Sequence, residues 1–430
     1  MSRRYDVAIV GLGPTGATLA NFCGRAGLRT LVIERSTAPT AHPRACHLDA
    51  EIARVFQQLG FEARLRELLT VSAGMEYVDR SGRRLFTFEG FEREPLLGWE
   101  EDHVFVQPEL DAMLRDGLQR FPHVQVSLGA DAPATHELEQ MARFVVACDG
   151  ATSTVRDELG IHLIDLGYDQ RWLVVDVMLH DGAVPPLPPI IQQVCDPHRL
   201  ATFVPSHGVH RRWEFQLAPD EAPPDPWPLL AAWGVEPQHG HLVRAVSYRF
   251  HALVAAAWRS GNVFLAGDAA HQMPPFMGQG MCSGIRDAAN LAWKLAEVID
   301  GSSPDSLLDS YERERRPHVE AVTRLSIDAG SLLATLADDP TAVPAADSPD
   351  PTRWSRLPGL NLGGEWPVGH LLPQPGRLDD RMPDGWAWVA NDPGFVVPDG
   401  RPLVVEPRAT NGHRALLVRP DRYIAGVSEG

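Results

Sequence analysis

Three glycines near the start of the chain have the spacing of a dinucleotide-binding turn. Gly11, Gly13 and Gly16 form a GxGxxG pattern after the apolar run 5–10, and Glu34 ends the next apolar run. Glycines permit a tight turn and a close approach of the backbone to a pyrophosphate, whose charge the following helix N-terminus stabilises. The acidic residue is placed to accept hydrogen bonds from a ribose. The pattern predicts a site for an ADP-containing dinucleotide without separating NAD from FAD.

A second group of residues that could take part in chemistry lies after residue 260. Gly267 and Asp268 follow the apolar run 262–266, and the glycine-containing segment 274–282 leads into a long helical pattern. Asp268, at the carboxyl end of a strand, can bind a polyol such as ribityl. The glycines let backbone N–H groups at a helix N-terminus face an electron-rich ring edge. This arrangement would stabilise negative charge on a reduced flavin, so the two patterns together favour FAD.

Taken together, the patterns resemble the FAD-dependent aromatic hydroxylases, which are single-component flavoprotein monooxygenases. The resemblance covers most of residues 4–330 and also rests on Pro43-Arg44-Ala45, Gln107-Pro108-Glu109-Leu110, Cys148-Asp149-Gly150-Ala151, Ser153-Thr154-Val155-Arg156 and the segment 311–317. Residues 278–295 are most similar to 3-(3-hydroxyphenyl)propionate hydroxylases and their polyketide-hydroxylase relatives. The implied fold class is α/β: a Rossmann-like (GR2-type) FAD-binding domain with an inserted β-rich substrate domain and a short C-terminal remnant of a thioredoxin-like domain.

The resemblance also implies which residues bind the cofactor. They are Gly11, Gly13, Gly16, Glu34, Arg35, Arg44, Gln107, Asp149, Asp268, Gly278, Gly280, Met281 and Cys282. Asp268 would hold the ribityl chain, and the backbone around Gly280 would meet the pyrimidine edge of the flavin. Asp149 belongs to a fingerprint linked to both FAD and the nicotinamide donor. Many relatives have Asn in place of Cys282, so a side-chain hydrogen bond there would be weaker.

The reaction implied by the resemblance is insertion of one oxygen atom of O2 into a phenolic ring. NAD(P)H, either NADH or NADPH, would reduce the FAD, and a flavin C4a-hydroperoxide would transfer the oxygen. The expected catalytic residues are Pro275, whose carbonyl would lie beside the substrate ring, and His47. His47 can help to deprotonate a phenol because histidine titrates near neutrality. The alternative for His47 is an ordinary pocket or surface histidine.

Four further side chains have competing interpretations. His271 follows the flavin aspartate, but packing or capping at the turn is favoured. Trp172 and Trp213 lie on strand-like runs and are expected in the core, with an aromatic substrate pocket as the alternative. For Arg212, a solvated strand end is favoured over a contact with a substrate carboxylate.

Hydrophobic periodicity places these residues on a βαβ framework. The apolar runs 5–10, 30–33 and 144–148 predict strands of a parallel sheet, and the pattern at 17–26 predicts a helix. The expected organisation is an FAD-binding domain over 1–165 and 261–336, a substrate domain over 166–260, a linker over 337–355 and a reduced C-terminal domain over 356–430.

Two regions depart from the family pattern. Relatives carry a long β-meander where this chain has only residues 129–143, so a short helix over 135–143 is expected to make the crossover. Cover over the flavin would then be reduced. The C-terminal region contains no cysteine, which argues against a thioredoxin-like redox function.

Composition excludes several classes of function. The formal net charge is −17 and no Lys/Arg cluster stands out, which argues against nucleic-acid binding. Apolar runs fall well short of the ~20 residues that span a bilayer. No signal peptide is apparent, so a cytoplasmic location without a membrane partner is expected. The five cysteines form no CxxC pair, so neither disulfides nor a metal site is predicted. A homodimer is left open.

Rival functions on the same framework are weighed by their residue requirements. A flavin-dependent halogenase needs a lysine near the substrate, yet Lys294, the only lysine, lies in the helix after the flavin motif. Two alternatives stay open. One is another FAD oxidoreductase (an epoxidase, oxidase or reductase), and the other is a non-catalytic FAD-binding scaffold.

Overall fold

The computed structural model describes residues 4–41, 43–88, 95–180, 187–343 and 357–428. Its first layer is a six-stranded sheet of order β15-β16-β9-β1-β2-β8. The strands are β1 (Tyr5–Val10), β2 (Thr30–Glu34), β8 (Val124–Leu128), β9 (Ala142–Ala147), β15 (Arg259–Ser260) and β16 (Val263–Leu265). All neighbours are parallel except β15 and β16. The predicted α/β fold with a parallel, Rossmann-like sheet is confirmed.

Helices cover the parallel sheet and connect its strands. The main ones are α1 (Pro14–Arg25), α4 (Gln107–Gly117), α8 (Gln279–Asp300) and α9 (Asp309–Asp338). Helix α1 begins three residues before the expected 17–26, because Pro14 suits the first helical turn. Helix α5 (Thr135–Met141) makes the short crossover from β8 to β9, as expected. Within the described residues, no helix combines the length and apolar character needed to span a membrane.

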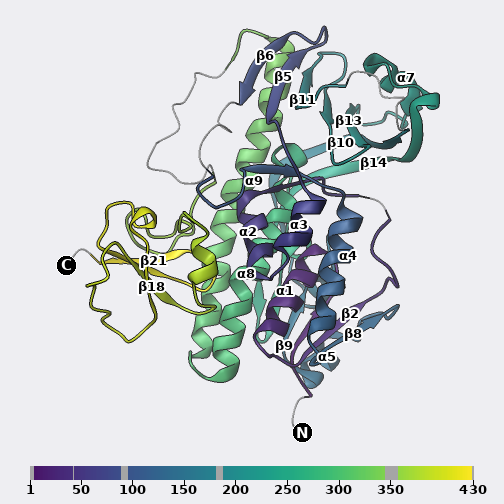
Figure 1. Cartoon of the computed structure of the whole chain (residues 1–430). Helices are drawn as coiled ribbons and strands as arrows, with labels where there is room; N and C mark the ends of the chain where they lie inside the picture. The colour runs from purple at the N-terminus through teal and green to yellow at the C-terminus, as the bar shows by residue number, and fades with distance from the viewer. Residues whose placement is uncertain (1–3, 42, 89–94, 181–186, 344–356, 429–430) are drawn as a thin grey trace.

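The second layer is an eight-stranded sheet of order β17-β14-β10-β13-β12-β11-β5-β6. Its strands are β5 (Met75–Asp79), β6 (Arg84–Phe88), β10 (Leu163–Leu179), β11 (Ile191–Cys195), β12 (Ala201–Val204), β13 (His210–Leu217), β14 (Gly240–Ala255) and β17 (His271–Gln272). The pairing is antiparallel except between β5 and β11. The strands β5 and β6 come from the segment expected to belong to the FAD-binding domain. Figure 1 shows α9 running from the parallel sheet to this second sheet.

A small third sheet carries His47. Strand β7 (Asp102–Val104) lies between β3 (His47–Asp49) and β4 (Thr70–Val71), with antiparallel pairing on both sides. Helix α2 (Ala50–Gln58) follows β3 directly, and the Asp49 carboxylate accepts a hydrogen bond from the Ile52 amide as its N-cap. Helix α3 (Glu62–Leu68) then leads back to β4. This cap fixes the direction in which the chain leaves His47.

The C-terminal residues form a separate four-stranded sheet of order β19-β18-β20-β21. The strands are β18 (Ala387–Ala390), β19 (Leu403–Val405), β20 (Ala415–Val418) and β21 (Ile424–Ser428). They enclose a small core that includes Leu372, Val389 and Leu416. A thioredoxin-like origin for this sheet stays a prediction. Most of the expected linker over 337–355 lies outside the described residues, which leave out 344–356, and α9 extends to Asp338.

Buried ion pairs attach the C-terminal sheet to the rest of the molecule, beside α8 and α9 in Figure 1. Arg54 of α2 binds Asp379 at 2.6 Å, and both side chains are almost fully buried. On α8, Lys294 binds Glu314 at 2.8 Å, and Arg419 donates to the same carboxylate at 2.9 Å. A buried carboxylate is costly unless charged donors satisfy it, so these contacts need the C-terminal sheet to be in place.

Replacing Arg54 should therefore destabilise the protein far more than replacing a surface arginine that spans the same interface. Arg54→Met removes a buried charge partner of Asp379 and should lower the free energy of unfolding by about 3 kcal/mol. Arg25→Met removes an exposed partner of Asp384 and should cost less than ~1 kcal/mol. Urea denaturation of both variants measures the difference. Equal effects would show that the buried pair does not hold the C-terminal sheet in place.

Candidate active site

A cavity of about 1630 Å³ extends from the carboxyl ends of the parallel strands to one face of the eight-stranded sheet. The residues predicted for cofactor binding or catalysis that line it are Gly11, Gly13, Glu34, Arg35, Arg44, His47, Gln107, Asp149, Asp268, Pro275, Gly278, Gly280 and Met281. The structure thus brings together motifs separated by more than 200 residues. Gly16 and Cys282 lie outside the cavity wall.

The turn between β1 and α1 contains two glycines that close packing requires and one that is open to the cavity. A Cβ on Gly11 would lie 2.4 Å from the Cys148 carbonyl oxygen, and one on Gly16 would lie 2.1 Å from the Gly11 oxygen. A Cβ on Gly13 would meet no protein atom within 4 Å. Gly13 is the N-cap of α1 and has no side chain over the first turn. The free N–H groups at this helix end are therefore accessible to an anion.

The Glu34 carboxylate is held in position beside this turn. One of its oxygens accepts the Leu12 amide at 2.7 Å, and the other accepts the Ser36 amide at 2.8 Å. Each oxygen keeps a lone pair for a further donor such as a ribose hydroxyl. Arg35 is exposed at the cavity edge. Asp111, which the sequence reasoning missed, also lines the cavity, and burial raises its pKa to about 7 although Arg115 opposes the shift.

The Pro-Arg-Ala segment is fixed from two sides. The Gln107 side-chain oxygen accepts the amides of Arg44 and Ala45 at 2.7 and 2.8 Å. Arg212 donates to the carbonyl oxygens of Pro43 and Arg44 from the other side. Gln107 therefore acts on this segment through its amide oxygen, while its own side chain still reaches the cavity wall. The backbone path of 43–45 is set before any ligand binds.

Two aspartates face the central part of the cavity. Asp149 accepts the Val155 amide at 3.3 Å, while its other oxygen is buried and has no partner among the described residues. Asp268 is exposed on the cavity wall, and the protein around it raises its pKa by partial desolvation. Both carboxyl groups can accept hydrogen bonds from a polyol or a ribose. The sequence predicts that Asp268 holds the ribityl chain of FAD and that Asp149 belongs to a fingerprint linked to both FAD and the nicotinamide donor.

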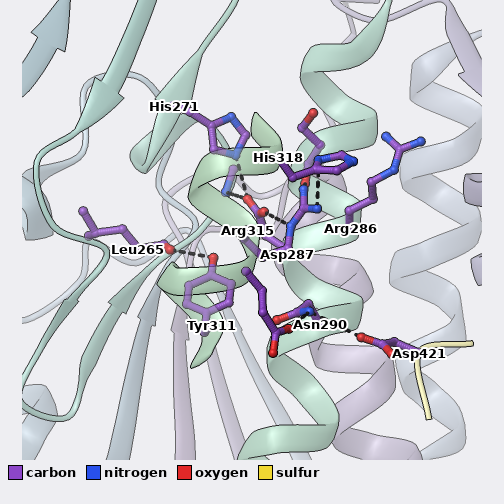
Figure 2. A network of polar contacts seen from close by, with 12 residues as sticks. Leu265, His271, Arg286, Asp287, Asn290, Tyr311, Arg315, His318 and Asp421 are labelled. Carbon is purple, nitrogen blue, oxygen red and sulfur yellow. Dashed lines mark hydrogen bonds and ion pairs between the residues drawn. The ribbon is translucent and has the colours of Figure 1, made fainter. Parts of the chain in front are cut away.

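A buried network centred on Asp287 holds the Asp268 turn (Figure 2). Asp287 accepts hydrogen bonds from the Gly267 amide at 3.0 Å, His271 at 2.7 Å and Arg315 at 2.9 Å. Burial by itself would raise the pKa of Asp287, but His271 and Arg315 lower it overall. His271 is buried and stacks on Trp258, so it packs at the turn as predicted. The network explains the 311–317 motif, since Arg315 links α9 to α8.

The start of α8 lines the cavity next to His47. Gly278 has a φ of +64° and is the N-cap of α8, where a Cβ would lie 2.5 Å from the His47 Nδ1 atom. The first turn of α8 carries no acidic residue, so its N–H groups face the cavity without a competing charge. The Cys282 thiol instead packs near the carbonyl oxygens of Gly278 and His47. Its predicted cofactor role is thus limited to the backbone.

His47 reaches the cavity as one member of a half-buried acid–base pair. Its Nε2 atom lies 2.7 Å from Asp102 Oδ1, because β3 and β7 pair side by side. The Nδ1 atom is buried and has no hydrogen-bond partner among the described residues. Burial would lower the pKa of His47, but the Asp102 carboxylate raises it well above the usual value. The pair can therefore take up a proton from a bound acid.

A second buried network lies under the sheet-facing side of the cavity. Asp176 accepts hydrogen bonds from His210 at 2.8 Å, Arg212 at 2.9 Å and Arg244 at 2.6 Å. The prediction that Arg212 is a solvated strand end is wrong, since only 2% of this residue is exposed. Arg212 lies on a strand whose alternate side chains point into the protein interior. Asp176 on the neighbouring strand neutralises the charge of Arg212. Trp213 packs in the core as predicted, and Trp172 contacts Phe276 edge-on at 5.5 Å.

A third chain of contacts connects α8 with the C-terminal sheet. Arg286 donates to Gln279 at 2.9 Å and also binds Asp49 and Glu51. Tyr423 donates to the same Glu51 side chain at 2.7 Å. The first residue of the helix at the cavity wall is therefore linked to a residue near the end of the chain. Sequence reasoning missed this link.

The missed residues share one property, which is that their partners are distant in sequence. Asp102 lies in a short strand, Asp176 in the long strand β10 and Glu51 at a helix start, and no local motif marks them. The only nearby signal was for Asp102, which precedes the short apolar run 104–106. Its pairing with His47 depends on strand register, which sequence alone does not fix.

Comparison with known proteins places the chain among flavoproteins. The family model described as "FAD binding domain" matches residues 4–326. The chain is 35% identical over 433 residues to the "Probable NADH-specific resorcinol 4-hydroxylase" of Rhodococcus jostii (strain RHA1), covering 91% of this chain and 80% of that one. It is 38% identical over 350 residues to a "3-(3-hydroxy-phenyl)propionate/3-hydroxycinnamic acid hydroxylase" of Mycobacterium sp. (strain JLS), covering 76% of this chain but only 60% of the relative.

Solved structures show the same fold at lower sequence identity. The ternary complex of aklavinone-11 hydroxylase with FAD and aklavinone has a TM-score of 0.78 and 22% identity, and the match covers 100% of this chain and 96% of that one. The flavin-dependent monooxygenase PieE in complex with FAD and substrate has a TM-score of 0.74 and 20% identity, covering 99% and 96% of the two chains. At these identities the likeness shows the fold of the chain.

Proposed function

The chain belongs to the FAD binding domain family, and from that premise we propose that it is an FAD-dependent monooxygenase that hydroxylates a phenolic ring with NAD(P)H and O2. One observation carries the proposal. A single cavity is lined by most of the residues predicted to bind FAD and also by His47 and Asp102, whose side chains pair at 2.7 Å. The substrate would be of the hydroxyphenylpropionate, resorcinol or polyketide type, as the names of the relatives suggest.

The residues that line the cavity fit FAD. The open N-terminus of α1 at Gly13 would receive the pyrophosphate, and Glu34 would accept the adenosine ribose hydroxyls. Asp268 would bind the ribityl chain, and Asp149, with its unpartnered oxygen, would face the same region. Arg35, Arg44 and Gln107 would complete the nucleotide side. The backbone of Gly280, Met281 and Cys282 at the start of α8 would face the flavin edge.

When bound, FAD would accept electrons from NAD(P)H and would then activate O2. The protein's own residues would orient the phenol and manage its proton. We propose that the His47–Asp102 pair takes up the phenolic proton, with Asp102 stabilising the positive charge on the protonated ring. Pro275 and Phe276 would border the substrate, with Trp172 and Tyr168 packed behind Phe276. Deprotonation makes the ring more electron-rich at the carbon to be hydroxylated.

The test is the visible spectrum of the purified protein, followed by NADH and NADPH oxidation with and without phenols. We expect a yellow protein whose oxidation of the nicotinamide rises with a phenol and whose product is heavier by one oxygen atom. A rate of NADH or NADPH oxidation that is the same with and without a phenol would indicate a reductase or oxidase. Failure to bind FAD, even when FAD is supplied, would point to a non-catalytic scaffold and overturn the proposal.

The cellular setting also belongs to the proposal. We expect a cytoplasmic enzyme that acts on a small molecule, with a homodimer as one possible state. Sedimentation analysis of the FAD-loaded protein over a range of concentrations distinguishes a monomer from a dimer.

A further inference from the structure

The cavity continues beyond the predicted flavin-binding residues onto the inner face of the eight-stranded sheet. Side chains from five strands of this sheet line this part, which we call the sheet chamber: Met75, Gln193, Thr202, Glu214 and Tyr248. Strand pairing explains their common orientation, because Thr202 lies opposite both Gln193 and Glu214 in register. Side chains at paired positions point to the same face of a sheet. The chamber is therefore the place for the part of a substrate that extends away from the flavin.

Glu214 is the acidic group of this chamber. Only 7% of the residue is exposed, and none of the described residues donates a hydrogen bond to its carboxyl group. A buried carboxyl without a donor is costly as a charged group. Burial raises the pKa of Glu214, although the nearby Arg212 opposes the shift. In the neutral form, the carboxyl both donates and accepts a hydrogen bond.

The arginines near Glu214 are engaged elsewhere. Arg212 donates to Asp176 and to the carbonyl oxygens of Pro43 and Arg44, and Arg244 donates to Asp176. Arg249, at the cavity edge, is paired with Asp169. Among the residues that the structure describes, no unpaired cation faces Glu214. A substrate carboxylate placed here would have to displace Asp176 from its arginines and would lie next to a second acidic group.

We propose that Glu214 binds a second ring hydroxyl of the phenolic substrate, so that the chain prefers a dihydroxylated ring over a phenol that carries a carboxylate. A hydroxyl is the complementary partner because it donates to one carboxyl oxygen and accepts from the other. Gln193 and Thr202 make the same face of the sheet polar. The Thr202 hydroxyl donates a hydrogen bond to the Gln193 side-chain oxygen at 2.7 Å. The proposal rests on the phenol hydroxylase function proposed above.

The test compares resorcinol, phenol and 3-(3-hydroxyphenyl)propionate on the FAD-loaded enzyme. The affinity of each compound is measured from the change in the flavin spectrum, and kcat/KM is measured from NADH or NADPH oxidation and product. For the natural protein, we expect kcat/KM to be at least tenfold higher for resorcinol than for the other two. A site built to hydrogen-bond a hydroxyl discriminates strongly against an analogue that lacks it.

Two substitutions at Glu214 separate hydrogen bonding from folding. Glu214→Leu should reduce the preference for resorcinol over phenol to nearly one. Glu214→Gln should retain part of the preference, because an amide also donates and accepts. The exposed surface substitution Glu67→Gln is the matched control and should leave the ratio unchanged. The ratio of two substrates on one variant does not depend on how much protein folds.

The proposal is overturned if 3-(3-hydroxyphenyl)propionate is preferred by the natural enzyme, or if Glu214→Leu keeps the resorcinol preference. Failure of the proposed function looks different. In that case no phenol stimulates NADH or NADPH oxidation, while the spectral titration still reports whether resorcinol binds more tightly than phenol and whether Glu214→Leu abolishes the difference.

Discussion

Replacing Gly13 by aspartate should abolish FAD binding while leaving the apoprotein as stable as before. Gly13 faces the cavity with no protein atom near its missing side chain, so a new side chain causes no internal clash. Its extended backbone, with φ −74° and ψ −176°, suits an aspartate N-cap. The new carboxylate would occupy the N-terminus of α1 and repel a pyrophosphate there. We expect the affinity for FAD to fall at least ~100-fold, or about 2.7 kcal/mol.

Two neighbouring substitutions serve as controls for this prediction. Gly13→Ala adds bulk without charge and should weaken FAD binding less. Gly11→Ala should instead impair folding, because the backbone has φ +96° and the new methyl would collide with the Cys148 carbonyl. Fluorescence titration with FAD and thermal unfolding of the apoproteins separate these outcomes. A Gly13→Asp protein that binds FAD normally would show that the pyrophosphate lies elsewhere.

His47→Gln is expected to lower kcat about 100-fold or more while the protein keeps its flavin. Glutamine preserves much of the side-chain size but cannot accept a full proton from the phenol, and general-base catalysis is worth at least this factor. Stopped-flow measurement of product formation with a saturating phenol tests the prediction. His198→Gln, at an exposed turn of the second sheet, is the control and should retain normal activity. An unchanged kcat would assign His47 to packing.

The pH dependence gives a second view of the same pair. As a base, His47 must be neutral, so kcat/KM should rise with pH through a pKa above the usual histidine value, because Asp102 raises it. Asp102→Asn removes the charge that favours the protonated ring. The rising limb should therefore move to lower pH, and kcat should fall because the ring is less well oriented. A limb that does not move would exclude His47 as the titrating group.

Local patterns predicted the parallel sheet and the glycine turn because their residues are close in sequence. The βαβ unit from Tyr5 to Glu34 contains its own strand, turn, helix and strand, and the structure matches it apart from the start of α1. The position of Asp268 beside that turn also follows from one short strand. Such features depend on periodicity and on turn chemistry, both of which a single sequence displays.

Features that depend on pairing between distant segments could not be predicted from local sequence patterns. Strands β5 and β6 join the second sheet only because β5 runs parallel to β11, more than 110 residues away. The residue type of Arg212 did not predict that Asp176 and two backbone carbonyl oxygens would accept its hydrogen bonds. Glu214 was overlooked because an acidic residue in a strand normally faces solvent. Three-dimensional burial, rather than residue type, determines what these groups can do.

The link from Tyr423 to Glu51 and Arg286 also has a consequence for biosynthesis. Its hydrogen bonds join positions 372 and 235 residues apart in sequence. Contacts of such long separation form late, because the entropy of closing a large loop must first be overcome. A nascent chain that has passed residue 300 already contains both glycine motifs, yet helix α8 at the cavity wall still lacks its final support. Cofactor capture should consequently be completed only after translation has reached the last strands.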